Sequence, residues 1–300
     1  MTAGRHAPRS HDSLGPISDS KAPLVLGNEG TGIVEGGATV EYPKGSRVMF
    51  TGPYGVLENG TLSELVAVQK EHLCFVPDNV DDAGAAGLPV AYLTAYLTLK
   101  AAGFQAGKTV LAPAIGGSVG NATTQLARAL GAKHAISTTT SHSKAEHAKE
   151  QGFSEVIDLS EEGLAEGVRR LTDDYGADIV VDAIGGQILS EALQILAPDG
   201  SLTTLGYAAS RKTTIDVTDL IWKRASIKSF SLFHQTLSAR SEAWKTITGL
   251  LNARRIEPVV AKTFPLEDAA NAIRYLIEGR PLLLRSESVT ITSELGDADR

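Results

Sequence analysis

The sequence predicts an α/β protein in which a doubly wound parallel sheet is inserted in a smaller β-rich domain. Three observations support this prediction. A glycine-rich turn joins a short apolar run to a helix at residues 109–131, strands and helices alternate from 109 to 232, and short β-like runs are separated by frequent turns from 24 to 77. The 300 residues suffice for two domains of about 150 residues each.

The glycine-rich turn predicts an anion site. The first amide N–H groups of a helix lack internal partners, so their partial positive charge faces the turn. Gly117 would let the backbone approach a pyrophosphate, and Gly120 would let the helix pack closely on the strand. Because Ile115 stands where G-x-G-x-x-G has its first glycine, the match is the looser A-x-x-G-x-x-G that begins at Ala114. A tight connection without a ligand remains the alternative.

Strand–helix alternation predicts the sheet. The expected strands are 109–112, 135–137, 155–157, 178–182, 201–205 and 227–232. The expected intervening helices are 119–130, 144–151, 164–172 and 188–196. Such alternation requires right-handed crossovers and a parallel sheet covered on both faces. Outside it, the pattern predicts strands at 32–34, 46–50, 65–68 and 288–292 and helices at 80–102, 241–253 and 265–278.

Composition limits the partners and the compartment. Lys and Arg number 28 against 35 Asp and Glu, and a net charge of −7 argues against binding nucleic acid or an anionic membrane. No apolar run approaches the about 20 residues that span a bilayer. The single Cys74 forms no internal disulfide and excludes a four-cysteine zinc site, so we predict a cytoplasmic protein.

Four stretches show a family resemblance. They are Gly27–Val34 with Gly45–Val48, Leu93–Tyr96, Ala114–Ala127, and Asp182–Gly186 followed by Gly200–Leu202 and Gly206. Their order and spacing, from about 23 to 277, resemble the zinc-independent branch of the medium-chain dehydrogenase/reductase superfamily, the quinone oxidoreductase-like proteins. The resemblance implies an incomplete GroES-like domain at 1–95 and 257–300 around a Rossmann domain at 96–256, with NADPH in the cleft between them. It also implies a small-molecule substrate and a homodimer paired through the edge strand 226–232.

Three departures from the family pattern bear on function. Relatives carry further residues before the glycine–glutamate motif, which form the first barrel strands and part of the substrate wall, whereas this chain has a polar lead-in there. The closing strand motif of the family is replaced at 280–285. Asn28 stands where members with catalytic zinc have a histidine, and no cysteine precedes Cys74, so we predict no zinc.

The end of the second expected Rossmann strand favours NADPH over NADH. An NAD site usually presents a carboxylate there, whereas this chain has hydroxyls over 137–143 followed by Lys144. Thr138 and Ser141 could donate to a 2′-phosphate and Lys144 would supply a positive charge, as the family's lysine does. An exposed serine/threonine loop is the alternative, and Leu159 replaces a tyrosine that is common in the family.

The resemblance and the strand ends together give the remaining cofactor-binding candidates. These are Ser118 and Val119 at the diphosphate, and Thr94, Ile184, Gly185, Gly206, Tyr207, Leu232 and Phe233 around the nicotinamide. A helix-entry turn, core packing and dimer packing are the structural alternatives for these positions.

No catalytic side chain is identified by the sequence. Tyr54, Asn28 and His234 are weak candidates for a proton donor, and water can protonate the product instead. The leading function is an NADPH-dependent reductase of quinones or of activated double bonds in α,β-unsaturated carbonyl compounds. The alternatives are a catalytically impaired nucleotide-binding protein that lacks part of its substrate wall, and a methyltransferase, whose glycine-rich turn also follows a first strand.

Overall fold

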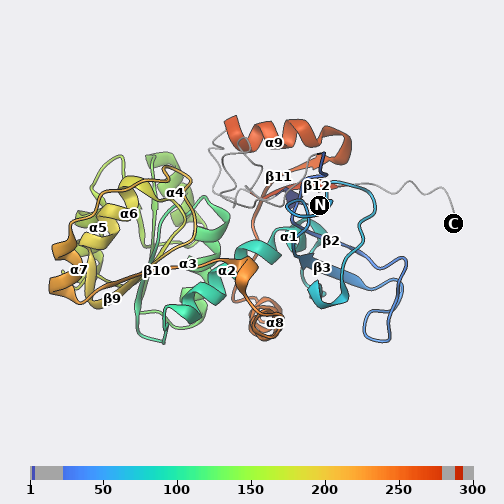
Figure 1. Ribbon diagram of the computed structural model, residues 1–300. Coiled ribbons are helices and arrows are strands. Elements are labelled where there is room, and N and C mark those ends of the chain that lie inside the picture. Colours follow the sequence, from blue (N-terminus) through green and yellow to red (C-terminus); the bar gives the residue numbers. More distant parts are fainter. Residues whose placement is uncertain (1, 4–22, 279–287, 293–300) are drawn as a thin grey trace. The chain divides into compact units, whose positions relative to one another are not determined.

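The computed structural model describes residues 2–3, 23–278 and 288–292 (Figure 1). The chain divides into two compact units. The parallel-sheet unit comprises Tyr92–Gln235, and the β-rich unit takes the described residues up to Ala91 and those from Thr236 onward.

The parallel-sheet unit contains six parallel strands. They are β5 (Thr109–Ala112), β6 (His134–Thr139), β7 (Val156–Asp158), β8 (Ala177–Asp182), β9 (Leu196–Thr204) and β10 (Ser226–Ser229). Their order, β10-β9-β8-β5-β6-β7, changes direction between β5 and β8, which is the topological switch point where ligands of such sheets bind. The predicted α/β fold with a doubly wound parallel sheet is confirmed.

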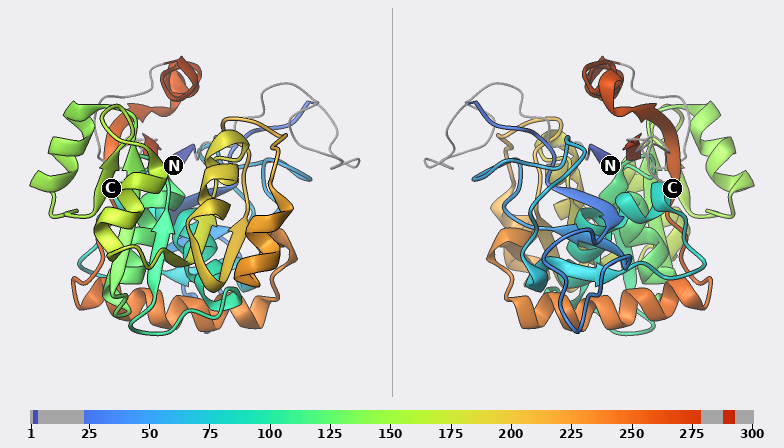
Figure 2. Two further views of the ribbon diagram at one scale, coloured as in Figure 1. Left: turned by 90° about the vertical axis from the view of Figure 1, so that its left-hand side faces the viewer. Right: turned by 90° about the vertical axis from the view of Figure 1, so that its right-hand side faces the viewer.

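Helices cover both faces of this sheet (Figure 2). They are α3 (Ser118–Ala129), α4 (His142–Glu150), α5 (Leu164–Thr172), α6 (Gly186–Gln194) and α7 (Val217–Lys223), while α2 (Leu88–Ala101) leads in from the other unit. The core beneath α5 and α6 includes Ile157, whereas its neighbour Val156 packs with Ala148 of α4. Because successive strand residues point to opposite faces, α4 lies on the face away from α5 and α6.

The β-rich unit has two three-stranded sheets. One is antiparallel with the order β2-β3-β4, from β2 (Glu29–Ile33), β3 (Arg47–Thr51) and β4 (Leu73–Phe75). The other has the order β1-β12-β11, from β1 (Thr2–Ala3), β12 (Ser288–Thr292) and β11 (Val260–Pro265). The helices of the β-rich unit are α1 (Asp82–Ala86), α8 (Leu237–Asn252) and α9 (Ala269–Glu278), and its 3₁₀ turns are η2 (Lys70–His72) and η4 (Leu266–Asp268), whereas the 3₁₀ turn η3 (Leu232–His234) lies at the end of the parallel-sheet unit.

Several expected elements differ from the structure. Residues 65–68 form no strand, since no described strand pairs with them and Leu65 is 72% exposed. The third strand of that sheet is β4 instead. The helix expected at 80–102 is interrupted at Gly87, which separates α1 from α2. The strand expected at 227–232 ends at Ser229 in β10, and the chain then enters η3.

Two helices differ from the expected pattern in other ways. The sequence pattern did not predict α7, although Asp216 caps it by accepting the Thr218 amide hydrogen. Helix α8 begins four residues earlier than expected, after Thr236 as its N-cap, and it belongs to the β-rich unit rather than to the 96–256 segment drawn from the resemblance. Residues 280–285, which replace the family's closing motif, lie outside the described part of the chain. Within that part, no helix combines the length and apolarity that crossing a bilayer requires.

Candidate cofactor-binding site

The turn after β5 is fixed by its neighbouring strand. Ala114 has a left-handed φ of 66°, and its amide donates to Thr138 Oγ1 at 3.0 Å. The amide of Ile115 donates to the Thr138 carbonyl at 2.8 Å. Thr138 is buried at the end of β6, so its hydroxyl positions the turn rather than facing solvent. Left-handed alanine costs about 1–2 kcal/mol and is typical of a backbone shaped for a ligand.

The helix N-terminus beyond this turn has the geometry of an anion site. Gly117 is the N-cap of α3 and provides no side-chain cap, and the first turn contains no acidic residue. Ser118 and Val119 are half-buried there. A Cβ on Gly120 would lie 2.3 Å from the Ala114 carbonyl oxygen and 2.6 Å from that of Pro113. Only glycine therefore lets the turn fold directly against the helix.

The hydroxyl-rich loop lies beside this turn at the end of β6. Ser141 is the N-cap of α4, and its Oγ accepts the Lys144 amide hydrogen at 3.4 Å. Lys144 is half-buried in the first helical turn. The structure thus groups Thr138, Ser141 and Lys144 on one strand end and the helix that follows it, at the carboxyl edge of the sheet. Leu159 follows the adjacent strand β7 and is half-buried.

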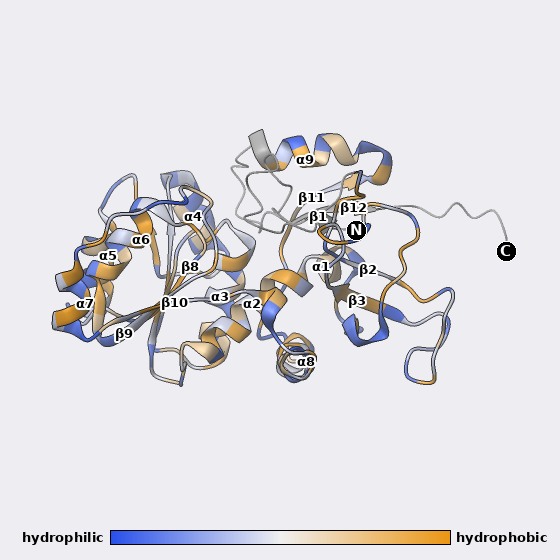
Figure 3. Cartoon of the chain, in the orientation of Figure 1, coloured by the Kyte–Doolittle hydropathy of each residue, from blue (hydrophilic) through white to orange (hydrophobic). Residues whose placement is uncertain are grey.

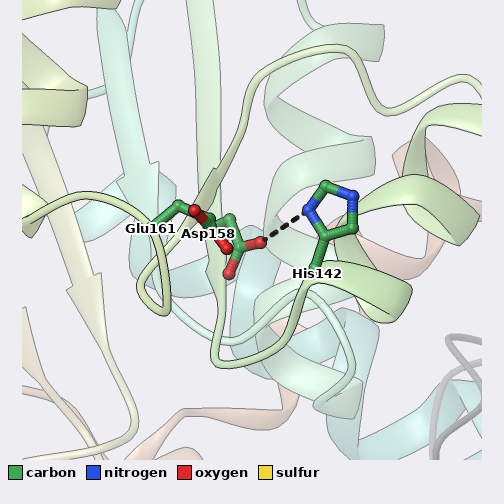
Figure 4. Close-up of side chains that lie close together, drawn as sticks. All are labelled: His142, Asp158 and Glu161. Atoms are coloured by element: carbon green, nitrogen blue, oxygen red, sulfur yellow. Dashed lines mark ion pairs between the residues drawn. The ribbon is translucent and has the colours of Figure 1, made fainter.

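Sequence reasoning missed a carboxylate at the same edge. Asp158, the last residue of β7, is buried, and its Oδ2 lies 3.4 Å from His142 Nδ1 (Figure 4). Burial by itself would raise the pKa of Asp158. Hydrogen bonds from Ser160 and the nearby His142 lower it by more than burial raises it, so the pKa lies below its usual value. The signal was available, because a polar residue at the end of one parallel strand lies beside the loop that follows its neighbour.

The loop after β8 forms the other side of the switch point. The fully buried Asp182 accepts hydrogen bonds at Oδ1 from the amides of Ile184 and Gly185, both at 3.0 Å. Its Oδ2 accepts from Thr204 Oγ1 on β9 at 3.1 Å. The sequence singled out this glycine-rich loop but not the carboxylate that orders it. A Cβ on Gly206 would lie 2.6 Å from the Ala183 carbonyl oxygen, so two loops meet closely there.

The remaining nicotinamide candidates fall in different settings. Gly185 has a φ of 70° and lies at the start of α6. Tyr207 is exposed after β9, with the Arg211 guanidinium 5.6 Å from its ring centroid. Leu232 and Phe233 lie in η3 rather than at a strand end, and Thr94 is buried within α2. The exposed His234 follows in the same 3₁₀ turn.

Tyr54 is enclosed in the β-rich unit. It is 1% exposed, its hydroxyl lies 2.8 Å from His72 Nδ1, and it accepts the Gln69 amide hydrogen at 3.0 Å. Phe50 packs edge-on against its ring. Burial is the main cause that raises the pKa of Tyr54. The Tyr54 hydroxyl therefore links two neighbouring segments of the β-rich unit, and this setting gives no support to a role as proton donor.

A buried glutamate shares the motif that contains Asn28. Glu29 is buried, and its Oε2 accepts the Val90 amide hydrogen of α2 at 2.6 Å. Burial raises the pKa of Glu29 from 4.5 to about 8, although the Val90 hydrogen bond lowers it. At neutral pH this side chain is therefore largely protonated.

The donor set at Asn28 does not fit a catalytic zinc ion. Asn28 is half-buried, and its carbonyl accepts from Thr51 Oγ1 at 2.8 Å. In the described part of the chain, the one group of three His, Cys, Asp or Glu side chains with metal-ligand spacing is His142, Asp158 and Glu161, which lies in the other unit.

Comparisons with known proteins agree with this architecture. Residues 118–252 match the zinc-binding dehydrogenase family. A 2-haloacrylate reductase from a Burkholderia species is 33% identical over 271 residues, which cover 87% of this chain and 80% of that one. A quinone oxidoreductase from Pseudomonas aeruginosa is 32% identical over 260 residues, or 83% of this chain and 77% of that one.

A solved structure extends the likeness to three dimensions. The quinone oxidoreductase from Thermus thermophilus, also solved in complex with NADPH, aligns with a TM-score of 0.72 at 29% identity and covers 86% of this chain and 79% of that one. The motifs, the sheet order and these relatives agree, and the chain belongs to the medium-chain dehydrogenase/reductase superfamily as an oxidoreductase of the quinone oxidoreductase-like group.

Proposed function

We propose that this protein is an NADPH-dependent oxidoreductase that reduces a quinone or the activated double bond of an α,β-unsaturated carbonyl compound. The observation that supports it most directly is the turn from Ala114 to Gly120, which leaves the amides of α3 open at the switch point of the sheet. The relatives named quinone oxidoreductase and 2-haloacrylate reductase support the substrate class.

Each part of the site has a proposed task. The amides that open α3 would bind the diphosphate, Ser141 and Lys144 the 2′-phosphate, and the loops at Gly185 and Gly206 the nicotinamide ribose. When bound, NADPH supplies a hydride to an electron-poor carbon or quinone. A proton from water completes the reduction, and the products are NADP⁺ and the hydroquinone or saturated carbonyl compound. The protein contributes binding and orientation.

We expect Lys144→Ala to weaken NADPH binding about tenfold or more and to leave NADH binding nearly unchanged. A charge-assisted hydrogen bond contributes about 1.5–3 kcal/mol, and only NADPH has the 2′-phosphate that would receive it. Separate titrations of NADPH and NADH, followed by cofactor fluorescence, measure both affinities. Lys149→Ala is the matched control, because Lys149 lies on the same helix in an exposed ion pair with Glu146.

The same titrations separate the alternatives. Equal affinity of the wild type for both cofactors would contradict the proposed pocket, and binding of S-adenosylmethionine instead of NADPH would indicate a methyltransferase. Turnover is then measured with 1,4-benzoquinone and a panel of enones. Tight NADPH binding without turnover on any of them would favour the catalytically impaired nucleotide-binding protein.

We also propose that the protein is a homodimer paired through β10 and acts in the cytoplasm, which its single cysteine suits. Strand β10 ends the described six-stranded sheet and pairs on one side with β9. Beside it, α7 exposes Val217, Ile221 and Trp222, the last at 80%, and the ribbon of α7 is partly coloured as hydrophobic in Figure 3. A second copy that pairs with this edge would cover both features.

We expect Trp222→Glu to convert the dimer to a monomer. A charge at the centre of an apolar interface stays unpaired and desolvated when the copies associate. Light scattering after gel filtration measures the mass of wild type and variant. Leu57→Glu is the control, since Leu57 is exposed on the β-rich unit and its replacement should leave the mass unchanged. A monomeric wild type would contradict the proposal.

A further inference from the structure

We propose that His142, Asp158 and Glu161 form a Zn²⁺-binding site in the parallel-sheet unit, separate from the position at which relatives carry catalytic zinc. His142 is the first residue of α4, Asp158 is the last of β7, and Glu161 follows in the next loop. One potential ligand atom from each lies within 4.8 Å of the others. Figure 4 shows the three side chains together at the carboxyl edge of the sheet.

The spacing of two of the ligand atoms matches zinc coordination. His142 Nδ1 and Asp158 Oδ2 are 3.4 Å apart. Two bonds of about 2.1 Å at a tetrahedral angle place their ligand atoms roughly 3.4 Å apart. A direct charge-assisted N–H···O hydrogen bond would instead be about 2.7–2.9 Å long. Glu161 is exposed, so side-chain rotation alone can bring its carboxylate closer.

The second observation is an unsatisfied carboxylate oxygen. Asp158 is 8% exposed, and its buried Oδ2 accepts no hydrogen bond from the described residues. Its Oδ1 accepts from the Ser160 amide at 3.0 Å and from Ser160 Oγ at 2.6 Å, which fixes the carboxylate with Oδ2 toward His142. A buried acceptor without a donor destabilises the fold, and a cation at Oδ2 would remove that cost.

The ligand set selects the metal. One imidazole with two carboxylates suits Zn²⁺, whereas Mg²⁺ prefers oxygen ligands alone. The N-terminus of α4 carries a partial positive charge of about +0.5, which repels a cation. The two negative charges of the carboxylates are larger than this partial charge. Bound zinc would tie the start of α4 to the end of β7 and so fix the segment that carries Ser141 and Lys144.

Calorimetric titration of the untagged full chain with ZnCl₂, after removal of metals with EDTA, tests the site. We expect one zinc ion per chain, at least about a tenfold loss of affinity in both His142→Ala and Glu161→Gln, and no comparable binding of Mg²⁺. His147→Ala is the matched control, because His147 lies on the same helix with its Nδ1 3.1 Å from Glu150 Oε2. His6 and His11 remain in every variant, so weak background binding cancels.

Thermal unfolding gives an independent readout. Zinc that binds the folded state alone raises the melting temperature of the wild type and of His147→Ala, and leaves that of His142→Ala unchanged. Zinc affinity that is equal in wild type and His142→Ala would overturn the proposal and leave a simple ion pair between His142 and Asp158. His142 is exposed, so its replacement should not impair folding, which circular dichroism checks. No nucleotide is needed, so the result is independent of the proposed function.

Discussion

Gly120→Ala is expected to weaken NADPH binding by at least about a hundredfold and to destabilise the fold by about 1–3 kcal/mol. The new Cβ would meet two backbone carbonyl oxygens, at 2.3 Å and 2.6 Å. Neither is a flexible side chain, so either the turn or the start of α3 must move. Such movement displaces the amides that would bind the diphosphate, and each lost charge-assisted hydrogen bond costs about 1.5–3 kcal/mol.

Two glycine controls make this test specific. Gly117→Ala places its Cβ 3.3 Å from the Ala114 carbonyl oxygen, so we expect a smaller loss of binding. Gly249→Ala in α8 meets nothing within 4 Å and should stabilise the helix by up to about 1 kcal/mol with binding unchanged. Fluorescence titration and urea unfolding measure both quantities. Wild-type affinity in Gly120→Ala would show that the cofactor does not bind against this turn.

Glu29→Gln is expected to make the protein several kcal/mol more stable than the wild type at pH 8.5. Burial raises the pKa of Glu29 from 4.5 to about 8 in the folded state, so the folded state holds a proton that the unfolded chain releases. The free energy of unfolding therefore falls as the pH rises from about 4.5 to 8, by up to about 1.4 kcal/mol per pH unit. Glutamine stays neutral, and its carbonyl still accepts the Val90 amide hydrogen.

Urea unfolding of both proteins from pH 5 to 8.5 measures this effect. All other titrating groups contribute equally to the free energies of unfolding of the two proteins, so the difference between these free energies reports the titration of Glu29 alone. We expect the variant and wild type to be similar near pH 5 and to diverge steadily up to about pH 8. Parallel curves over the whole range would contradict a protonated Glu29.

Much of the parallel sheet was predictable from the sequence because its strands are short, apolar and bounded by glycine. The runs at β5 and β8 are buried along their whole length and mostly apolar, and their polar residues, Thr109, Asp178 and Asp182, lie at or next to the strand ends. The missed α7 has only seven residues, and of its apolar side chains Leu220 packs against the core while Val217, Ile221 and Trp222 are exposed, so its sequence shows no clear amphipathic pattern. Residues 65–68 have strand-forming composition, but a strand also needs a neighbour that pairs with it.

The parts of the site that depend on backbone conformation were predictable from the sequence. The parts that depend on contacts between side chains distant in the sequence were less predictable. The turn at Gly117 and Gly120 follows from local sequence, since a Cβ at Gly120 would collide with two backbone carbonyl oxygens and one at Gly117 would be tight. The approach of His142 to Asp158 depends on the pairing of β6 with β7, which no local pattern records. Tyr54 follows a glycine–proline turn that suggests exposure, yet its hydroxyl lies between His72 and Gln69.

The hydrogen bonds of the Asp182 carboxylate affect the affinity with which a ligand can bind at the switch point of the sheet. It bonds two amides of its own loop and the hydroxyl of Thr204 on the adjacent strand, so this loop is already preorganised when the sheet forms. A ligand at the switch point would then lose little affinity to the ordering of that loop. These residues lose their conformational entropy when the protein folds, so that loss does not occur again when a ligand binds.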